Sequence, residues 1–356
     1  MKVLMTTGGS GGHIFPALQV ALQLKAQGRE VVFAGSLGMA QDKLRAAGFK
    51  VIHIPAQGLN SRSPLGLMHF AGVMCRATLA AIKVLRQERP NKVMGFGGYG
   101  SFAVITAAWL LRYPSMIHEQ NVVPGKANRL MSFLVKKVAI SFKSSSKYFP
   151  DGKTIWTGCP CHSGPVNKSR KELLSAFGLA GDDKVILLLG GSQGSHRLNE
   201  VFFKMFLNGG QGARLQAVHM TGQKEYEAYR AKYQEHRLPV VAHAFINNIE
   251  EAYCLADVVV ARAGASTVCE LGLLGKPCVL SPYPFAGNHQ QFNAQVLSDI
   301  GVAILLKEKD LDAVALRQAI DMLLAKGDGG ASLQVKAEGL FNSEAAKCLA
   351  QAVEAL

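Results

Sequence analysis

Short apolar runs alternate with longer amphipathic stretches along most of the chain. The first run, residues 3–5, leads into a glycine-rich turn at residues 7–12 and then into apolar residues at helical spacing. This order predicts a strand, a loop and a helix. Pro16 suits the first turn of that helix, and Gly28 suits the left-handed position beyond its end.

The alternation continues to residue 306. Further strands are predicted at residues 30–34, 50–54, 92–94, 137–142, 153–157, 184–189, 215–220, 240–245, 257–261, 277–280 and 302–306, with another ending at 118–121. Strands that alternate with helices form parallel sheets through right-handed crossovers. We therefore expect an α/β protein of two doubly wound, Rossmann-like domains that face each other across a cleft.

The boundary between the two domains is expected near residue 160. Residues 158–160 interrupt the alternation, and the polar stretch that follows to residue 171 is typical of a linker. The expected domains are residues 1–160 and residues 161–340. The remaining residues, 341–356, include an amphipathic helix that we expect to join the first domain.

Composition and charge narrow the class of protein. The chain has 356 residues, of which 49% are hydrophobic, and this fits a globular fold. Its net charge of +14 is compatible with binding to nucleic acid, to an anionic membrane surface or to a phosphorylated substrate, and it does not distinguish among the three. No signal peptide precedes the first strand, and the longest uncharged apolar stretch, residues 102–111, is shorter than the roughly 20 residues that span a bilayer. A soluble or peripheral protein is expected.

Residues 64–89 form an unusual segment in which large apolar residues are mixed with charges that are all basic before Glu88. The segment is either a helix that lies on an anionic membrane or a helix whose apolar face joins the core. Basic residues at 126, 129, 136 and 137 favour the membrane interpretation.

Polar candidates in the first half lie where strands end. His13 follows the first glycine turn, where a helix amino terminus attracts phosphate or a developing oxyanion. Residues 95–100 match G-x-G-x-x-G, with Glu119 near the position of a ribose-binding acid, although this signal is weak alone. Residues 118–121 add a polar run at the carboxyl end of a strand, where open α/β sheets bind ligands.

The second half carries two further candidates besides the glycine turn at 190–195. Glu270 lies one turn into a helix that begins after Gly264, and it either binds ribose hydroxyls or compensates its own helix dipole. Residues 288–293 contain five amide or imidazole side chains, which suit a sugar ligand or a helix cap.

Metal-dependent chemistry has little support in the sequence. Asp310 and Asp312 match a D-x-D pattern but stand where a helix begins, which favours N-capping. Cys159, Cys161 and His162 have no second ligand pair with zinc-like spacing, and the seven cysteines favour reduced thiols. We expect no bound metal.

Six motifs, at residues 8–16, 95–101, 118–121, 190–194, 262–270 and 290–291, together resemble the MurG family of peptidoglycan glycosyltransferases. The resemblance covers nearly the whole chain. It implies a GT-B fold and an inverting, metal-independent transfer of N-acetylglucosamine from UDP-GlcNAc to lipid I, which gives lipid II. The acceptor is the C4 hydroxyl of the muramoyl sugar on an undecaprenyl pyrophosphate carrier.

The resemblance also implies where the enzyme works and what it binds. It implies a peripheral protein at the cytoplasmic face of the membrane, in contact with the anionic inner leaflet. UDP-GlcNAc and the lipid-linked acceptor are its partners; no cofactor and no nucleic acid is expected.

Site residues follow from the same resemblance and from the chemistry. The base on the acceptor hydroxyl is expected to be His13, with Glu119 as the substitute, unless His13 only orients the acceptor. The expected donor-binding residues are Ser10, Gly11, Gly12, Asn121, His162, Ser192, Gln193, Ile246, Ala265, Ser266, Thr267, Val268, Glu270, Gln290 and Gln291. The expected acceptor-binding residues are Ser10, His13, Tyr99 and Asn121.

The chain departs from the family pattern at one position. His162 stands where the family has an arginine that reaches the donor phosphates. A neutral imidazole is a weaker partner for phosphate than a guanidinium. His162 is therefore protonated on binding, or Lys168 or Arg197 replaces it, or the contact is dispensable.

Three other functions stay open on the sequence alone. An NAD-dependent oxidoreductase would use the turn at 95–100 but leaves Glu270 and Gln290 unexplained. A UDP-sugar epimerase of the same fold needs no lipid acceptor. A module that binds membranes or nucleic acid would have no use for His13.

Overall fold

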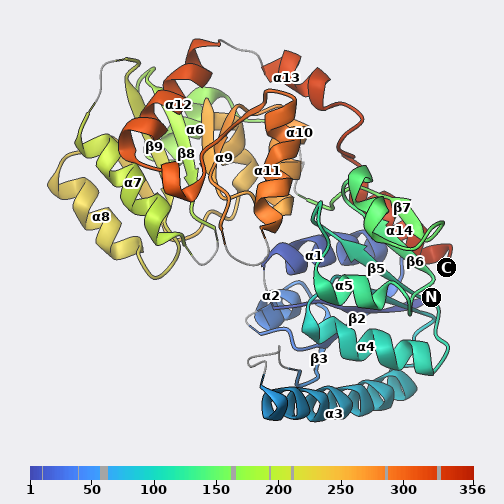
Figure 1. The fold of residues 1–356 in the computed structure, drawn as a ribbon. Helices are drawn as coiled ribbons and strands as arrows, with labels where there is room; N and C mark the ends of the chain where they lie inside the picture. The colour runs from blue at the N-terminus through green and yellow to red at the C-terminus, as the bar shows by residue number, and fades with distance from the viewer. Residues whose placement is uncertain are drawn as a thin grey trace. The chain divides into compact units, whose positions relative to one another are not determined.

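The computed structural model describes residues 1–9, 11–38, 40–56, 63–161, 166–191, 194–209, 212–284, 288–326 and 330–356. The chain divides into two compact units (Figure 1). The amino-terminal unit comprises Met1–Cys161 and Leu340–Leu356, and the carboxy-terminal unit comprises His162–Gly339. Each unit has its own parallel sheet, so the expected α/β class is confirmed.

The amino-terminal unit is built on a seven-stranded sheet of order β3-β2-β1-β4-β5-β6-β7, in which every neighbouring pair is parallel. The order reverses between β1 and β4, and open α/β sheets bind ligands at such a switch point. The strands are β1 (Lys2–Thr6), β2 (Glu30–Gly35), β3 (Lys50–His53), β4 (Lys92–Gly95), β5 (Ser115–Glu119), β6 (Lys137–Ile140) and β7 (Thr154–Trp156).

Helices cover both faces of this sheet. One core contains α1 and residues of α14, and the other contains α3 and α4. The helices are α1 (Gly11–Ala26), α2 (Ala40–Ala46), α3 (Pro64–Glu88), α4 (Tyr99–Leu110), α5 (Lys126–Met131), the 3₁₀ helix η1 (Lys143–Tyr148) and α14 (Ala345–Glu354). Leu349, Ala350 and Val353 of α14 are fully buried against α1, and Arg29 pairs with Glu354 at 2.6 Å.

Helix α1 begins earlier than its proline predicts. It starts at Gly11, so Pro16 lies in its second turn rather than its first. A proline has no N–H, so only the helical hydrogen bond to the carbonyl of Gly12 is missing. Gly28 has a φ of +74° just beyond the helix, as predicted.

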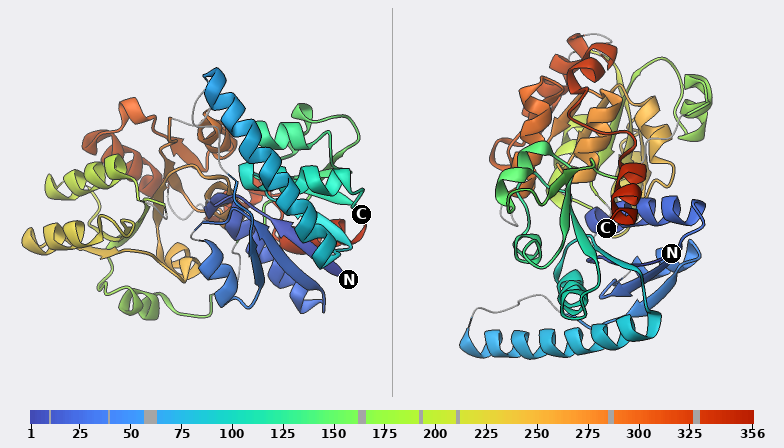
Figure 2. Two further views of the ribbon diagram at one scale, coloured as in Figure 1. Left: turned by 90° about the horizontal axis from the view of Figure 1, so that it is seen from below. Right: turned by 90° about the vertical axis from the view of Figure 1, so that its right-hand side faces the viewer.

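Helix α3 lies along the outer side of the amino-terminal unit, beside α4 (Figure 2). Its inner face, including Met74, Ala77 and Leu85, joins the core, which confirms one of the two interpretations of this segment. Its outer face carries Leu65 and Met68, which are 80% and 72% exposed.

Within the described ranges, α3 is the one helix long and apolar enough to cross a membrane by length and composition, and only 18% of its most apolar window is buried. The sequence expectation missed it because it considered only uncharged runs. A core helix passes the same test, and one face of α3 is a core face.

The carboxy-terminal unit has a six-stranded sheet of order β10-β9-β8-β11-β12-β13, again parallel throughout. Its strands are β8 (Lys184–Leu189), β9 (Leu215–Met220), β10 (Val240–His243), β11 (Val258–Ala261), β12 (Cys278–Leu280) and β13 (Ala303–Leu305). Its helices are α6 (Arg170–Ala176), α7 (His196–Leu207), α8 (Tyr226–Glu235), α9 (Ile249–Leu255), α10 (Ala265–Leu274), α11 (His289–Asp299), the 3₁₀ helix η2 (Glu308–Asp310), α12 (Ala313–Ala325) and α13 (Gly330–Ala337). The order reverses between β8 and β11, which gives this sheet its own switch point.

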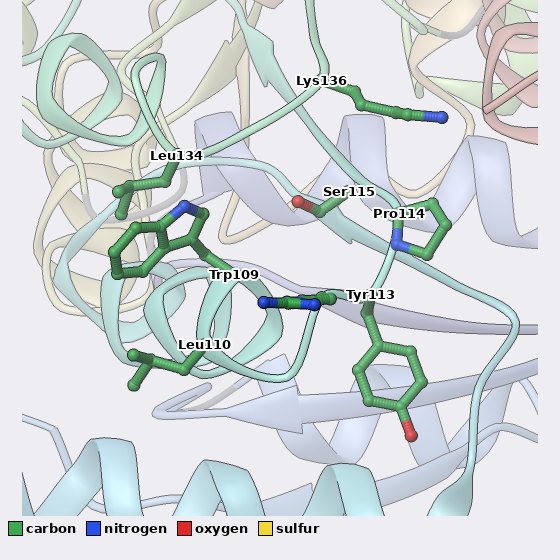
Figure 3. A pocket seen from close by; sticks show the side chains of 8 residues that line it. Trp109, Leu110, Tyr113, Pro114, Ser115, Leu134 and Lys136 are labelled. Atoms are coloured by element: carbon green, nitrogen blue, oxygen red, sulfur yellow. The ribbon is translucent and has the colours of Figure 1, made fainter.

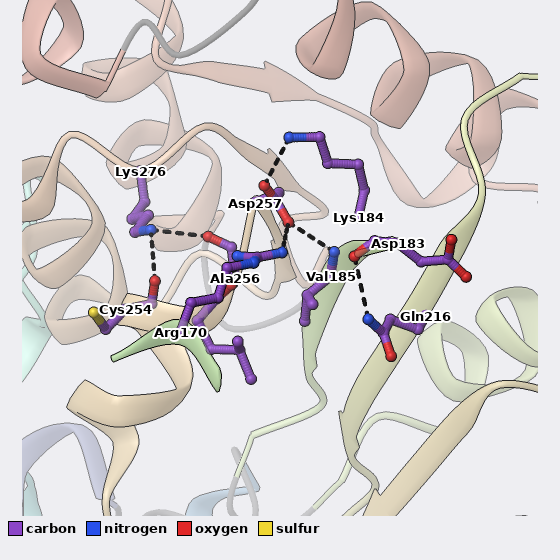
Figure 4. Close-up of polar contacts among 10 residues, drawn as sticks. Arg170, Asp183, Lys184, Val185, Gln216, Cys254, Ala256, Asp257 and Lys276 are labelled. Atoms are coloured by element: carbon purple, nitrogen blue, oxygen red, sulfur yellow. Dashed lines mark hydrogen bonds and ion pairs between the residues drawn. The ribbon is translucent and has the colours of Figure 1, made fainter. Parts of the chain in front are cut away.

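A polar clasp joins the amino-terminal ends of β8 and β11 (Figure 4). Asp257 accepts a hydrogen bond from the N–H of Val185 at 2.8 Å and pairs with Arg170 at 2.9 Å and Lys184 at 3.1 Å. Burial would raise the pKa of the Asp257 carboxyl, but these three donors together hold that pKa below its ordinary value. The clasp lies at the opposite end of the strands from the glycine turn that follows β8.

Candidate functional site

His13 is seated in a slot lined by glycines. A Cβ atom at Gly8 would lie 3.2 Å from Cδ2 of the imidazole, and one at Gly97 would lie 3.2 Å from Cε1. Gly97 and Gly98 also have φ values of +90° and +81°, which side chains disfavour. The turn that matches a dinucleotide fingerprint therefore makes room for an imidazole.

The surroundings of His13 keep its imidazole neutral at pH 7. Burial lowers the pKa of His13, while the Glu119 carboxylate, the Gln120 side chain and the backbone of Phe96 oppose this effect without reversing it. Nδ1 lies 3.2 Å from Oε1 of Gln120. A neutral imidazole can accept a proton, which a general base requires.

Glu119 is occupied by the loop that follows β5. Its Oε1 accepts hydrogen bonds from the backbone N–H of Asn121 at 2.8 Å and from the Asn121 amide at 3.0 Å. Its Oε2 accepts from the N–H of Gly125 at 3.2 Å and from the Asn128 amide at 2.7 Å. The carboxylate is 1% exposed. These contacts make it the anchor of the loop.

The other candidates of the amino-terminal unit lie around His13. Gly11 and Gly12 form the start of α1, and Asn121 is held beside Glu119. Tyr99 opens α4 and is 45% exposed, with its ring edge-on to Phe70 of α3 at 6.0 Å. The structure thus gathers His13, Glu119 and Asn121 at the carboxyl ends of β1, β4 and β5.

In the carboxy-terminal unit, Asn199 of α7 braces the turn after β8. Its Nδ2 donates to the Thr221 carbonyl at 3.0 Å and to Glu225 at 2.7 Å. A Cβ at Gly190 would lie 2.9 Å from Oδ1 of Asn199, and one at Gly194 would lie 2.6 Å from the Thr221 carbonyl. Only glycine therefore fits these two positions without a shift.

Helix α10 begins where the sequence predicts the helix whose amino terminus would bind an anion. It starts at Ala265 after Gly264 without a side-chain cap, and the amino-terminal end of a helix attracts anions through its dipole. Glu270 is 9% exposed and accepts a hydrogen bond from the Tyr253 hydroxyl at 2.7 Å. Ser266 and Thr267 are half-buried.

Val268 differs from its neighbours in α10. Its side chain is fully buried, and its N–H is bonded to the Gly264 carbonyl at 2.9 Å. Its predicted contact with the donor therefore remains a prediction that neither burial nor hydrogen bonding supports.

The amide cluster at the start of α11 mainly holds the backbone before α10. Oε1 of Gln290 accepts from the N–H groups of Ala263 at 3.1 Å and Tyr283 at 2.9 Å, and Asn293 donates to the Ala263 carbonyl at 3.2 Å. Gln291 is half-buried, and its side chain makes no hydrogen bond within the described part of the chain. Ile246 is buried in the loop after β10.

Four expected site residues, Ser10, His162, Ser192 and Gln193, lie outside the described residues. The two cations considered as replacements for the family arginine are engaged elsewhere. Lys168 pairs with Glu251 at 2.7 Å, and Arg197 donates to the Leu311 carbonyl at 2.9 Å.

The predicted capping role of Asp312 is confirmed. Its Oδ1 accepts from the N–H of Ala315 at 2.8 Å at the start of α12. No group of three potential metal ligands occurs among the residues that the structure describes.

Sequence reasoning missed Asn128, Asn199 and Tyr253. Each bonds to a carboxylate, namely Glu119, Glu225 or Glu270. An asparagine among the apolar residues of a helix was the available signal for the first two.

The match to family models decides the family. Residues 3–140 match the glycosyltransferase family 28 N-terminal domain, and residues 185–351 match the C-terminal domain of that family. The chain belongs to glycosyltransferase family 28.

Relatives of this glycosyltransferase match nearly its whole length. A protein of Desulfotalea psychrophila is 38% identical, with 90% of this chain and 87% of that protein covered. One of Nitratidesulfovibrio vulgaris is 34% identical, with 100% and 97% covered. Both are named UDP-N-acetylglucosamine–N-acetylmuramyl-(pentapeptide) pyrophosphoryl-undecaprenol N-acetylglucosamine transferase.

Solved structures agree on the fold. The crystal structure of Acinetobacter baumannii MurG is 28% identical, with a TM-score of 0.75 and 100% of this chain and 99% of that chain covered. A UDP-GlcNAc 2-epimerase of Neisseria meningitidis, 16% identical with a TM-score of 0.65 and both chains fully covered, shares the fold alone. The expected GT-B fold is confirmed.

Proposed function

We propose that this glycosyltransferase moves N-acetylglucosamine from UDP-GlcNAc to the C4 hydroxyl of the muramoyl sugar of lipid I, which gives lipid II for peptidoglycan synthesis. The substrates are those named for its full-length relatives. The observation that carries the proposal is the neutral, glycine-seated imidazole of His13 at the switch point of the first sheet.

The reaction is a single displacement with inversion. The acceptor oxygen bonds to C1 of the sugar, the bond from C1 to the UDP oxygen breaks, and its electron pair leaves with UDP. His13 takes the proton of the acceptor hydroxyl. A positioned base of this kind contributes roughly 10²- to 10⁴-fold to the rate.

Glu119 has a supporting role in this proposal. Its four accepted hydrogen bonds leave it poorly placed to take a proton from the acceptor. Its negative charge nevertheless favours the imidazolium that forms on His13 during transfer. We therefore assign the base role to His13 and the anchoring of Asn121 to Glu119.

The donor is assigned to the carboxy-terminal unit. The first turn of α10, which comprises Ala265, Ser266 and Thr267, receives the diphosphate at the helix amino terminus and stabilises the charge that grows on it without a metal. Glu270, oriented by Tyr253, binds the ribose hydroxyls. Ile246, Gln290 and Gln291 complete the nucleotide site.

The proposed membrane contact is the outer face of α3, against the anionic leaflet on the cytoplasmic side. Leu65, Met68 and Leu79 are each at least 66% exposed there, and the charges beside them before Glu88 are basic. Trp109, which is 51% exposed, adds a second apolar site where Arg112 and Lys136 line a pocket of about 550 Å³ (Figure 3). Apolar groups mixed with basic ones bind anionic lipid surfaces.

The test of the reaction uses radiolabelled UDP-GlcNAc and a soluble lipid I analogue, with and without EDTA. We expect a disaccharide product and one UDP released per sugar transferred, unchanged by EDTA. UDP release or an epimerised sugar without acceptor would favour the epimerase alternative. Loss of turnover in EDTA would overturn the metal-free mechanism.

The test of membrane binding is sedimentation with lipid vesicles. The double variant Met68→Asp, Leu79→Asp should lose binding to vesicles that contain anionic phospholipid. Met322→Asp, on α12, is the matched control, because Met322 is an exposed apolar residue of the other unit. Equal binding by the two variants would exclude α3 as the contact.

A further inference from the structure

A chain of buried hydrogen bonds leads from the backbone of Gly158 to the imidazole of His13. Nε2 of the Gln120 amide lies 3.0 Å from the Phe96 carbonyl oxygen. A carbonyl only accepts hydrogen bonds, so the amide nitrogen must face it. The amide oxygen then faces Nδ1 of His13 at 3.2 Å, and because that oxygen also only accepts, Nδ1 must carry the proton.

The hydrogen bonds of His118 determine which group donates and which accepts along the whole series. Nε2 of His118 lies 3.0 Å from the Gly158 carbonyl, so it donates, and its Nδ1 accepts from the Gln120 amide at 3.3 Å. Burial lowers the pKa of His118 to about 4, so this ring is neutral in the physiological range. Two backbone carbonyls, of Phe96 and Gly158, therefore determine the position of every proton in the chain.

Within the described part of the chain, few ionisable groups face His13. The Glu119 carboxylate and the His118 ring are the ones that act on it or respond to its charge. Gly8, Gly97 and Gly98 pack against the ring, and Asn128 borders the slot at Gly97, where a Cβ would lie 3.1 Å from its amide oxygen. The proton on Nδ1 is thus assigned by neutral acceptors, the Gln120 amide oxygen together with the Phe96 backbone, rather than by a carboxylate.

We propose that Gln120 is a positioning residue for the transfer reaction, which, through His118, holds His13 in the tautomer with Nδ1 protonated and the lone pair on Nε2. The proton of the acceptor hydroxyl then moves to Nε2. This inference rests on the proposed function for its role in catalysis, whereas the tautomers themselves do not depend on it.

The first test measures the tautomers without any substrate. In protein labelled with ¹⁵N-histidine, long-range ¹H–¹⁵N NMR at pH 7.5 distinguishes protonated from unprotonated ring nitrogens. The signals are assigned by their loss in His13→Gln and His118→Gln. We expect the proton on Nδ1 of His13 and on Nε2 of His118. A proton on Nε2 of His13 would overturn the proposal, whatever reaction the enzyme catalyses.

The second test measures the consequence for transfer. Gln120→Met should lower kcat roughly 10- to 100-fold, which is less than the roughly 10²- to 10⁴-fold that the base itself contributes, and leave the KM for UDP-GlcNAc unchanged. The acid limb of kcat/KM should move to lower pH, because the amide acceptor that favours the imidazolium is lost.

A double-mutant cycle separates positioning from general damage. In the His13→Ala background, Gln120→Met should cause no further loss, because Gln120 acts only through His13. Gln216→Met is the matched control: Gln216 is also a buried amide that donates to a carbonyl, that of Asp183, in the other unit (Figure 4). Additive losses, or the same loss in the control, would overturn the proposal. Correct tautomers in an enzyme with no transferase activity would instead count against the proposed function.

Discussion

Each unit of this glycosyltransferase buries a neutral histidine beneath a glycine turn, and the two histidines serve different ends. His118 in the first unit and His219 in the second are both fully buried, and burial lowers their pKa values to about 4 and about 3. Nε2 of His219 lies 3.0 Å from Oδ1 of Asn199, and the Tyr233 hydroxyl donates to its Nδ1 at 2.7 Å. Both rings therefore carry their proton on Nε2.

The two histidines differ in the group that their series of hydrogen bonds reaches. The chain through His118 ends at a second imidazole, that of His13, whose remaining nitrogen keeps a lone pair. The chain through His219 ends at Asn199 and at the carbonyl and carboxylate that Asn199 binds, and so it shapes a backbone turn. The same residue type directs a reactive side chain in one unit and supports the backbone after β8 in the other.

Replacing His13 should have the largest effect. His13→Ala should lower kcat by roughly 10²- to 10⁴-fold, because the acceptor hydroxyl loses its base, and should leave the affinity for UDP unchanged. Steady-state transfer to a lipid I analogue and calorimetric titration with UDP measure the two quantities. A kcat within threefold of the wild type would mean that His13 only orients the acceptor.

Acid should destabilise the first unit before the carboxylates titrate. The folded state resists protonation of His118, whereas the unfolded chain binds that proton near pH 6.5. Stability should therefore fall by about 1.4 kcal/mol per pH unit between about pH 6.5 and pH 4. Both tryptophans, Trp109 and Trp156, lie in this unit, so urea unfolding followed by tryptophan fluorescence reports it. His118→Gln should reduce the slope; an unchanged slope would contradict the assignment.

Removing the brace in the second unit should weaken donor binding rather than the chemical step. Asn199→Ala removes one hydrogen-bond partner each from His219, the Thr221 carbonyl and Glu225, and it loosens the backbone at Gly190 and Gly194. The affinity for UDP should therefore fall about tenfold, or about 1.4 kcal/mol. Calorimetric titration measures it, with Asn208→Ala at the exposed end of α7 as the control. A loss confined to kcat would break the comparison between the units.

The smallest effect is expected at the clasp between β8 and β11, and only on stability. Asp257→Asn removes two ion pairs with partly exposed partners, so it should cost about 1 kcal/mol at pH 7 and leave kcat unchanged. Because the pKa of Asp257 is lowered in the folded state, this contribution exists above the ordinary value near 3.8 and is lost as the pH falls through the lowered value. Thermal unfolding of both proteins from pH 7 to pH 3 should show the difference shrinking.

The sequence predicted the sheets well because buried parallel strands are short apolar runs between turns. Residues 184–189 and 215–220 match β8 and β9 at both ends. The sequence also placed the polar residues 118–121 at a strand end. The sequence could not show which oxygen atoms already accept hydrogen bonds, so Glu119 was an alternative to His13 as the base. The four hydrogen bonds that the Glu119 carboxylate accepts are visible only in the structure.

The glycine turn at 95–101 shows a second limit of sequence reasoning. Its pattern matches a nucleotide-binding loop, but the reason for its glycines is a side chain that comes more than eighty residues earlier, His13. A local glycine pattern indicates that another group lies too close to the backbone for a side chain. It does not indicate which side chain or ligand that group belongs to.

The position of α14 sets the order in which this protein can be completed during synthesis. Domains generally fold in the order in which they leave the ribosome. Here the first unit lacks Leu349, Ala350 and Val353 until α14 emerges, after every residue of His162–Gly339 has been made. The unit begun first is therefore finished last, and until then its α1 face stays open to water and to chaperones.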